Sequence, residues 1–209
     1  MKNLMYVLCV LMFCTVGCQT QNRLERAKSK MAKVKMKEFK REGWKLLGTS
    51  NTLEVALLEH YNQLKDPQNK EMESFVSNYI SINVGQQTAF NNALIMYANL
   101  AGSTLRGRVA SDLSIDQGSR GAGFDKMYAA YERLVEQEVK GVLAESFALV
   151  KKNGQSGQMR VFFLVNEEKA MQARLNALRR AARETELAQQ YARQITRFVR
   201  EGFEIPEVE

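Results

Sequence analysis

Side chains suited to acid and base chemistry are few in this sequence. His60 is the single histidine, so histidine metal clusters are excluded and at most one imidazole could act as a general base. It follows Glu59 in a stretch of helical spacing, and the spacing suggests neither an orienting carboxylate nor a nucleophile. We therefore expect His60 to pack within the fold or to lie at a solvent edge.

Three carboxylate pairs could supply the acid and the base of a glycosidase. They are Glu136 with Glu138, Glu167 with Glu168, and Asp112 with Asp116. Only the third pair has the i, i+4 spacing that places both carboxylates on one helix face, and none has a Lys, His or metal partner in register. We interpret all three pairs as exposed charges, and we expect no catalytic residue, no metal site and no cofactor.

The three cysteines lie within the first eighteen residues, at positions 9, 14 and 18. A single Lys2, an apolar run over 4–16 and the small residue Gly17 are together typical of a secretory signal. The run is too short to span a bilayer, which takes about 20 apolar residues. We predict that residues 1–17 are removed, leaving a mature chain without disulfides or thiolate metal sites.

The residues before Cys18, Thr15-Val16-Gly17, resemble the lipobox of bacterial lipoproteins. That family usually has Leu or another aliphatic residue where this chain has Thr15. The resemblance implies that the Cys18 thiol takes a diacylglycerol and that its amine takes an acyl chain such as palmitate; two or more chains anchor a protein stably. Gln19, in place of Asp, implies the outer membrane, facing the periplasm. The alternative is a soluble secreted ligand-binding protein that is cut nearby.

Positive charge is concentrated after Cys18. The chain has 30 Lys and Arg against 23 Asp and Glu, and nine of the basic residues fall between Asn22 and Glu42, with three acidic ones. Behind a lipid anchor such a segment would meet anionic headgroups, each cation contributing about 1 kcal/mol; a merely solvated helix is the alternative. Export and the lack of a basic strand with stacking aromatics argue against nucleic acid. The predicted membrane-surface patch is Arg23, Arg26, Lys28, Lys30, Lys33, Lys35 and Lys37.

The first part of the mature chain reads as two helices. Apolar residues at three- and four-residue steps predict a helix over 22–42, and Gly43 is placed to end it. A short extended piece over 44–48 follows, with Trp44 expected in the core rather than in a groove for a peptide or sugar. Asn51 with Glu54 predicts a capped helix over 52–65, which Asp66-Pro67 ends.

Strict alternation predicts a half-buried strand over 76–84, and the pattern then changes to a helix from 86 to about 115. Small residues in that helix would let it lie close against a sheet: Ala93, Ala98, Ala101, Gly102 and Gly107. The glycines of a flexible loop over 117–123 do not match a phosphate-binding spacing. A helix over 124–139 follows.

Two apolar runs, 142–150 and 159–165, flank Asn153-Gly154, which predicts a β-hairpin. The chain then ends in a long helix over 167–201, about 35 residues or some 50 Å, whose outer faces carry seven arginines, Arg174 among them. A helix of that length exceeds what a small sheet can cover. We therefore expect an overhang that binds an envelope protein partner or a second copy of the chain through Arg179, Arg180, Arg183, Arg193 and Arg197.

The expected fold is α+β, with helices packed on a small, mostly antiparallel sheet and a long C-terminal helix. The chain divides into a lipoprotein signal peptide (1–17), a lipid-anchored basic N-terminal helix (18–42), an α+β core domain (43–166) and the Arg-rich C-terminal helix and tail (167–209).

Two parts of the chain resemble a family of small bacterial outer-membrane lipoproteins, typified by a twenty-kilodalton envelope lipoprotein. They are the predicted strand over 79–84, which leads through Gly85 into Ala89, Ala93 and Leu100-Ala101, and the hairpin at 142–165. A related domain begins a flagellar T-ring assembly protein. The segment Glu42-Gly43-Trp44-Lys45 is similar to related lipoproteins. The resemblance implies a non-enzymatic scaffold or binding protein of the envelope. The alternative is an enzyme, or an enzyme accessory, that acts on a cell-wall polymer.

Overall fold

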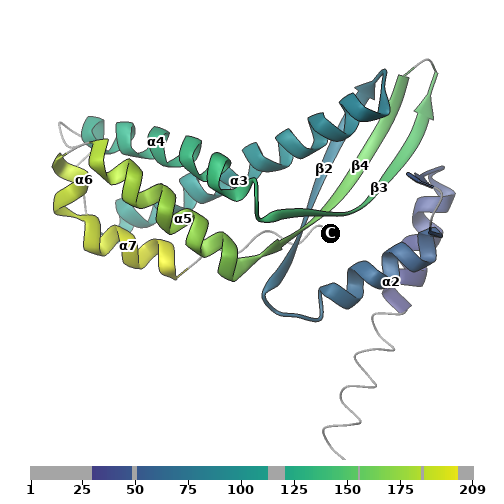
Figure 1. Ribbon diagram of the computed structural model, residues 1–209, viewed down its shortest axis with the longest axis horizontal. Coiled ribbons are helices and arrows are strands. Elements are labelled where there is room, and N and C mark those ends of the chain that lie inside the picture. The colour runs from purple at the N-terminus through teal and green to yellow at the C-terminus, as the bar shows by residue number, and fades with distance from the viewer. Residues whose placement is uncertain (1–29, 49–50, 113–120, 155, 185, 202–209) are drawn as a thin grey trace, which may run out of the picture. The chain divides into compact units, whose positions relative to one another are not determined.

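The computed structural model describes residues 30–48, 51–112, 121–154, 156–184 and 186–201 (Figure 1). Cys18 and the predicted patch residues Arg23, Arg26 and Lys28 lie outside the described residues. The chain forms two compact units that meet in sequence between Gln63 and Leu64.

In the first unit, a helix over residues 30–41 ends as the sequence predicted. Gly43 has a φ of 85°, a left-handed conformation that costs glycine little. Its N–H donates to the Lys40 carbonyl (3.2 Å), and the Trp44 N–H donates to the Phe39 carbonyl (2.8 Å). This pair of bonds is a Schellman cap, which satisfies the last carbonyls of the helix. Trp44 is buried, as expected.

The short strand β1 (Lys45–Leu46) and helix α2 (Leu53–Gln63) complete the first unit. The predicted cap at Asn51 is wrong by one residue. The Thr52 hydroxyl accepts a bond from the Val55 N–H at 3.3 Å, so Thr52 is the N-cap and Asn51 stays exposed. Thr and Asn cap helices through the same kind of side-chain acceptor, so the sequence alone did not separate the two.

The second unit contains three long strands and most of the helices. They are β2 (Asn69–Tyr79), α3 (Ile82–Asp112), α4 (Gly121–Val139), β3 (Leu143–Asn153), β4 (Ser156–Asn166), α5 (Glu167–Ala181), a 3-10 turn (Ala182–Glu184), α6 (Glu186–Gln190) and α7 (Ala192–Arg200). β4 lies between β3 and β2 and is antiparallel to both. The predicted α+β class and the β3–β4 hairpin are confirmed, and Gly154 in the turn has a φ of 62°.

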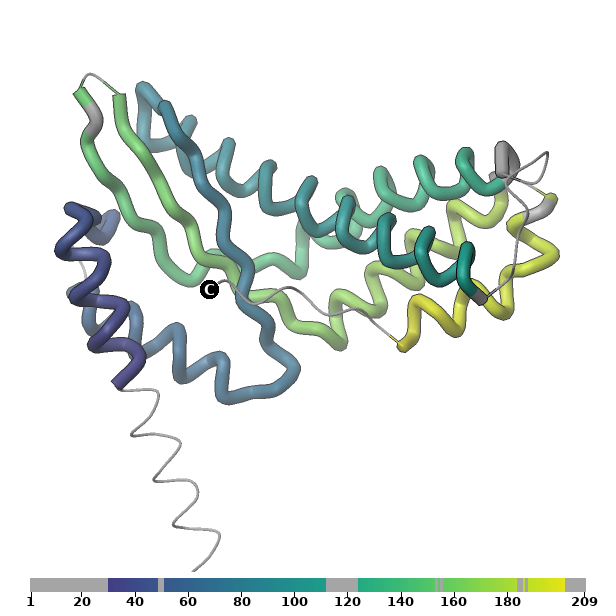
Figure 2. Tube along the Cα trace, turned by 180° about the vertical axis from the view of Figure 1, so that it is seen from behind, coloured from purple at the N-terminus to yellow at the C-terminus, as the bar shows by residue number. Residues whose placement is uncertain are grey.

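The first half of α3 lies along this sheet (Figures 1 and 2). Phe90 of α3 meets Phe163 of β4, with ring centroids 6.0 Å apart. Phe163 pairs with Met72 of β2, and Val161, two residues earlier, pairs with Ser74 of β2. All four strand residues are buried, so this face of the sheet and α3 share one core.

The predicted strand over 76–84 is wrong beyond Tyr79, because α3 begins at Ile82. The Tyr79 ring fills the space beside two glycines: a Cβ added to Gly157 would clash with the ring, and one added to Gly85 would lie 2.9 Å from its Cγ. This packing fixes the corner between β2 and α3. Ile80 is 98% exposed. The alternation of apolar and polar residues around it therefore belongs to a turn and not to a half-buried strand.

Past the sheet, α3 continues into a helical bundle with α4, α5 and α7 (Figure 2). The small residues predicted to face a sheet partly serve this bundle instead. Gly102 is buried against the Glu132 side chain of α4, where any Cβ would clash, whereas Gly107 faces open space. Gly121 and Gly123, predicted in a loop, belong to α4, and residues 117–120 lie outside the described part.

The predicted long C-terminal helix is wrong. After α5 the chain turns through the 3-10 segment and α6, and α7 folds back against α5 and α3. A straight helix would have carried Ala188, Ile195 and Phe198 past the end of the core. The reversal buries all three, and the gain from burying apolar area explains the break. The predicted overhang therefore does not exist among the described residues.

Candidate interaction surfaces and a buried arginine

Arg174 of α5 lies in the core of the helical bundle, with 1% of its surface exposed. Its guanidinium donates to both carboxylate oxygens of Glu167, with Nη1 3.4 Å from Oε2, and also to the Tyr97 hydroxyl of α3. Glu167 stands two turns before Arg174 on the same face of α5. The Asn166 side chain caps this helix by accepting from the Lys169 N–H at 3.2 Å.

The electrostatics of this cluster follow from its burial. Burial raises the pKa of Tyr97 to about 12 and moves the pKa of Tyr131 in the same direction. Burial also acts to lower the pKa of Arg174, but the hydrogen bonds and charge interactions with Glu167 and Tyr97 together outweigh that effect, and the pKa lies above its usual value. The cluster therefore combines an ionised Arg–Glu pair with neutral phenols.

A small pocket reaches this cluster from outside. Its lining is Ala101, Thr104, Leu105, Arg108, Tyr131, Arg174, Phe198 and Val199, and its volume is about 10 Å³. That is about the room one water molecule needs, whereas ligand sites usually measure roughly 300–1,000 Å³. We therefore interpret the cluster as a structural tie between α3 and α5. Arg108 ties α7 to α3 in a similar way, by donating to the Phe198 carbonyl (3.2 Å) and to Glu201 (2.7 Å).

Two of the candidate acid and base residues, Glu167 and His60, make contacts within the fold. Glu167, expected to be an exposed charge, instead pairs with buried Arg174, whereas Glu168 is exposed as expected. His60 is buried in α2 and meets the Tyr61 ring edge-on at 5.6 Å, which confirms a packing position. Within the described ranges, no group of three His, Cys, Asp or Glu side chains could hold a metal ion.

The five arginines predicted to bind a partner are all exposed. Arg180 pairs with Glu138 at 3.0 Å, and Arg197 pairs with Glu201 at 3.7 Å. Because the chain reverses after α5, these arginines do not line one continuous helix: Arg179, Arg180 and Arg183 lie at the end of α5 and in the turn after it, and Arg193 and Arg197 lie on α7.

The helix over residues 30–41 has a strongly basic outer side. Exposed cations recur on it at three- and four-residue steps, which places them on one face: Lys30, Lys33, Lys37, Lys40 and Arg41. We call these five residues the basic face. Lys35, predicted with them, lies on another side of the helix, is half-buried and pairs with Glu38 at 3.6 Å. Lys40 and Arg41 belong to the face although the predicted patch omitted them.

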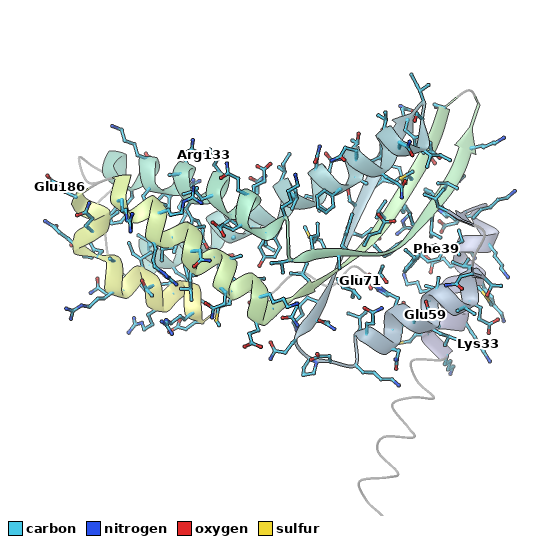
Figure 3. The ribbon with its side chains drawn as sticks, in the orientation of Figure 1. Lys33, Phe39, Glu59, Glu71, Arg133 and Glu186 are labelled. Carbon is cyan, nitrogen blue, oxygen red and sulfur yellow. The ribbon has the colours of Figure 1, made fainter. Side chains whose placement is uncertain are left out.

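Apolar side chains lie on two sides of the same helix. Phe39 and Ala32 are buried, opposite the basic face; Lys33 and Phe39 are labelled in Figure 3. Met31 and Val34, beside the basic face, are 54% and 57% exposed. A helix with cations and exposed apolar residues on its outer side suits the surface of an anionic bilayer. No described helix has the length and apolar content to cross a membrane.

In comparisons with known proteins, no family model, curated protein or solved structure matches the chain. The resemblance to envelope lipoproteins therefore remains a hypothesis. Of the segments that carry it, the hairpin at 142–165 forms as expected, and the segment over 79–84 does not form a strand.

Proposed function

We propose that this chain is a lipid-anchored, non-enzymatic lipoprotein that acts as a scaffold or binding protein at the periplasmic face of a bacterial outer membrane. The basic face of the helix over 30–41 is the observation that carries the proposal. Five cations and no acid share this face, and each cation near an anionic surface contributes about 1 kcal/mol. The anchor motif at Cys18 precedes this helix in the sequence.

The spacing between anchor and helix supports a joint action. The eleven residues over 19–29 reach at most about 40 Å even when fully extended. An acylated Cys18 would therefore keep the basic face within that distance of the headgroups. A lipid chain with a polybasic patch is a recognised pair of signals for stable membrane attachment.

Metabolic labelling with a fatty-acid analogue in a bacterial host tests the proposal. The wild-type chain should take up label and appear in the outer-membrane fraction, and Cys18→Ala should lose both properties. Cys14→Ala, a matched cysteine change four residues earlier, should keep them. An unlabelled wild-type chain in the soluble periplasmic fraction would favour the alternative of a secreted ligand-binding protein and would contradict the proposal.

A further inference from the structure

The outer side of α3 is unusual in its lack of charge. Charged residues make up 25% of the chain, yet none occurs between Glu73 and Arg106. This interval includes about the first three quarters of α3. A surface helix ordinarily carries charged residues on the side away from the core, so the interval calls for a physical explanation.

The exposed side chains of this part of α3 form a row. Every fourth residue is exposed and uncharged: Gln87, Asn91, Ile95, Asn99 and Ser103. We call these five residues the uncharged ridge. Ile95, at its centre, is 45% exposed, and Met96 beside it is 50% exposed. Gln87 donates to Asn91 at 3.0 Å along the ridge. On the buried side of the helix, Ala89 and Ala93 are fully covered.

The residue types of the ridge indicate which kind of surface could bind to it. A helix that lies on an anionic bilayer needs Lys or Arg on its polar side, and the ridge has none. A charged protein surface would lose hydration against it without gaining an ion pair. The cores of protein interfaces, in contrast, are depleted in charge and enriched in Met. Asn and Gln side chains both donate and accept hydrogen bonds. The polar groups of one uncharged ridge can therefore form hydrogen bonds with those of a second copy of the ridge.

We propose that two copies of this chain associate through the uncharged ridge, about a two-fold axis at Ile95. In a two-fold interface, if residue i meets residue j, then j also meets i. With the two helices antiparallel, which favours their dipoles, Ile95 meets Ile95 of the second copy, and Asn91 meets Asn99 of the second copy. Ridges with a four-residue repeat pack at a crossing angle of about 50°, so the contact is centred on Ile95.

The area that this contact can bury limits the affinity of the dimer. The ridge from Gln87 to Ser103 is about 24 Å long at 1.5 Å per residue, and the helix is roughly 10 Å wide. Two such helices that cross at an angle bury less than the roughly 800 Å² per partner of a standard interface. We therefore expect a dimer with a Kd in about the micromolar range, formed through α3 and not through the C-terminal helix.

Cysteine cross-linking tests the geometry. The background is the full chain in mild detergent with Cys9→Ser, Cys14→Ser and Cys18→Ser, which contains no other cysteine. Ile95→Cys should give a disulfide-linked dimer on mild oxidation, because a disulfide requires Cα atoms about 4.4–6.8 Å apart. A mixture of Asn91→Cys and Asn99→Cys should form a mixed dimer, and each variant alone should form little.

Sedimentation of the same background measures the association without a disulfide. Ile95→Lys should weaken the dimer at least tenfold. Ile82→Lys is the matched control, because Ile82 is 46% exposed on the same helix but lies outside the ridge; it should leave the dimer unchanged. Circular dichroism checks that both variants fold. A monomer at all concentrations, or equal effects of the two lysines, would overturn the proposal. Cross-linking of Asn91→Cys to itself in place of the mixed pair would overturn the antiparallel arrangement.

Discussion

The helix over residues 30–41 and helix α3 both present a polar face to solvent, but the two faces differ in charge. The first face has five cations and no acid, and the second has no charge at any of the five positions of its ridge. A basic face attracts an anionic surface over the Debye length, about 10 Å at 0.1 M salt. An uncharged face attracts nothing at that range and acts through close packing and hydrogen bonds.

The two units also differ in whether they bury charged side chains. The described part of the first unit keeps its cations at the surface or half-buried, and its helices rely on caps at Gly43 and Thr52. The second unit buries Arg174 with its Glu167 and Tyr97 partners. The surface charge of one unit and the core polarity of the other can therefore be changed separately.

The largest expected effect is in the core of the second unit. Glu167→Ala leaves the Arg174 guanidinium buried without its carboxylate, so we expect the free energy of unfolding to fall by about 3 kcal/mol. Glu168→Ala, at the exposed neighbouring position, should change it by about 0.5 kcal/mol or less. Urea unfolding measures both. Equal losses in the two variants would show that the buried pair does not hold α5 in place.

The next effect concerns the basic face. The triple change Lys33→Gln, Lys37→Gln and Lys40→Gln, made in residues 19–209, should weaken binding to anionic vesicles by about 3 kcal/mol, or roughly 100-fold. The loss should shrink as salt is added. The control triple removes three exposed lysines of the second unit: Lys126, Lys140 and Lys152. If vesicle flotation weakens equally with the control, total charge and not the basic face governs binding.

A smaller effect is expected at alkaline pH. Burial raises the pKa of both Tyr97 and Tyr128 to about 12, above the value of about 10 in an unfolded chain. The neutral phenols therefore stabilise the fold fully below pH 10, and this contribution is lost as the pH rises through about 12. Tyrosinate absorbance and circular dichroism should change together in that window. Full ionisation of all seven tyrosines near pH 10.5 with the fold intact would contradict the burial argument.

The smallest effect distinguishes the two candidate caps of α2. Thr52→Ala removes the acceptor of the Val55 N–H and should cost about 1 kcal/mol of stability. Asn51→Ala should lower the stability by only a few tenths of a kcal/mol, or about 0.3 kcal/mol. Thermal unfolding of the two variants, compared with the wild type, gives the ranking. A larger loss of stability in Asn51→Ala than in Thr52→Ala would show that Asn51 is the N-cap, as the sequence spacing suggested.

The parts of the fold that the sequence predicted correctly rest on local signals. Gly43 at the helix end and Asn153-Gly154 in the hairpin are backbone requirements that residue type reveals directly. The prediction of a strand over 76–84 failed beyond Tyr79, because the corner there depends on the packing of the Tyr79 ring against Gly85 and against Gly157, which is far away in the chain. The long C-terminal helix failed because its apolar stripe fits equally well on a chain that folds back.

The candidate surfaces were predicted to different degrees. The density of lysine marked the basic segment, but separating Lys35 from the basic face needed the pairing with Glu38. The burial of Arg174 gave no local signal, since its helix carries arginine on several sides. The uncharged ridge did have a sequence signal, which is the absence of charge between Glu73 and Arg106.

The proposed location and role both depend on the lipid at Cys18, and intact-mass analysis of the chain extracted from its native membrane in detergent detects that lipid. We expect a polypeptide that begins at Cys18 and carries the added mass of a diacylglycerol and an acyl chain. A polypeptide that begins at Met1, or one that begins at Cys18 with an unmodified thiol, would rule out the lipid anchor.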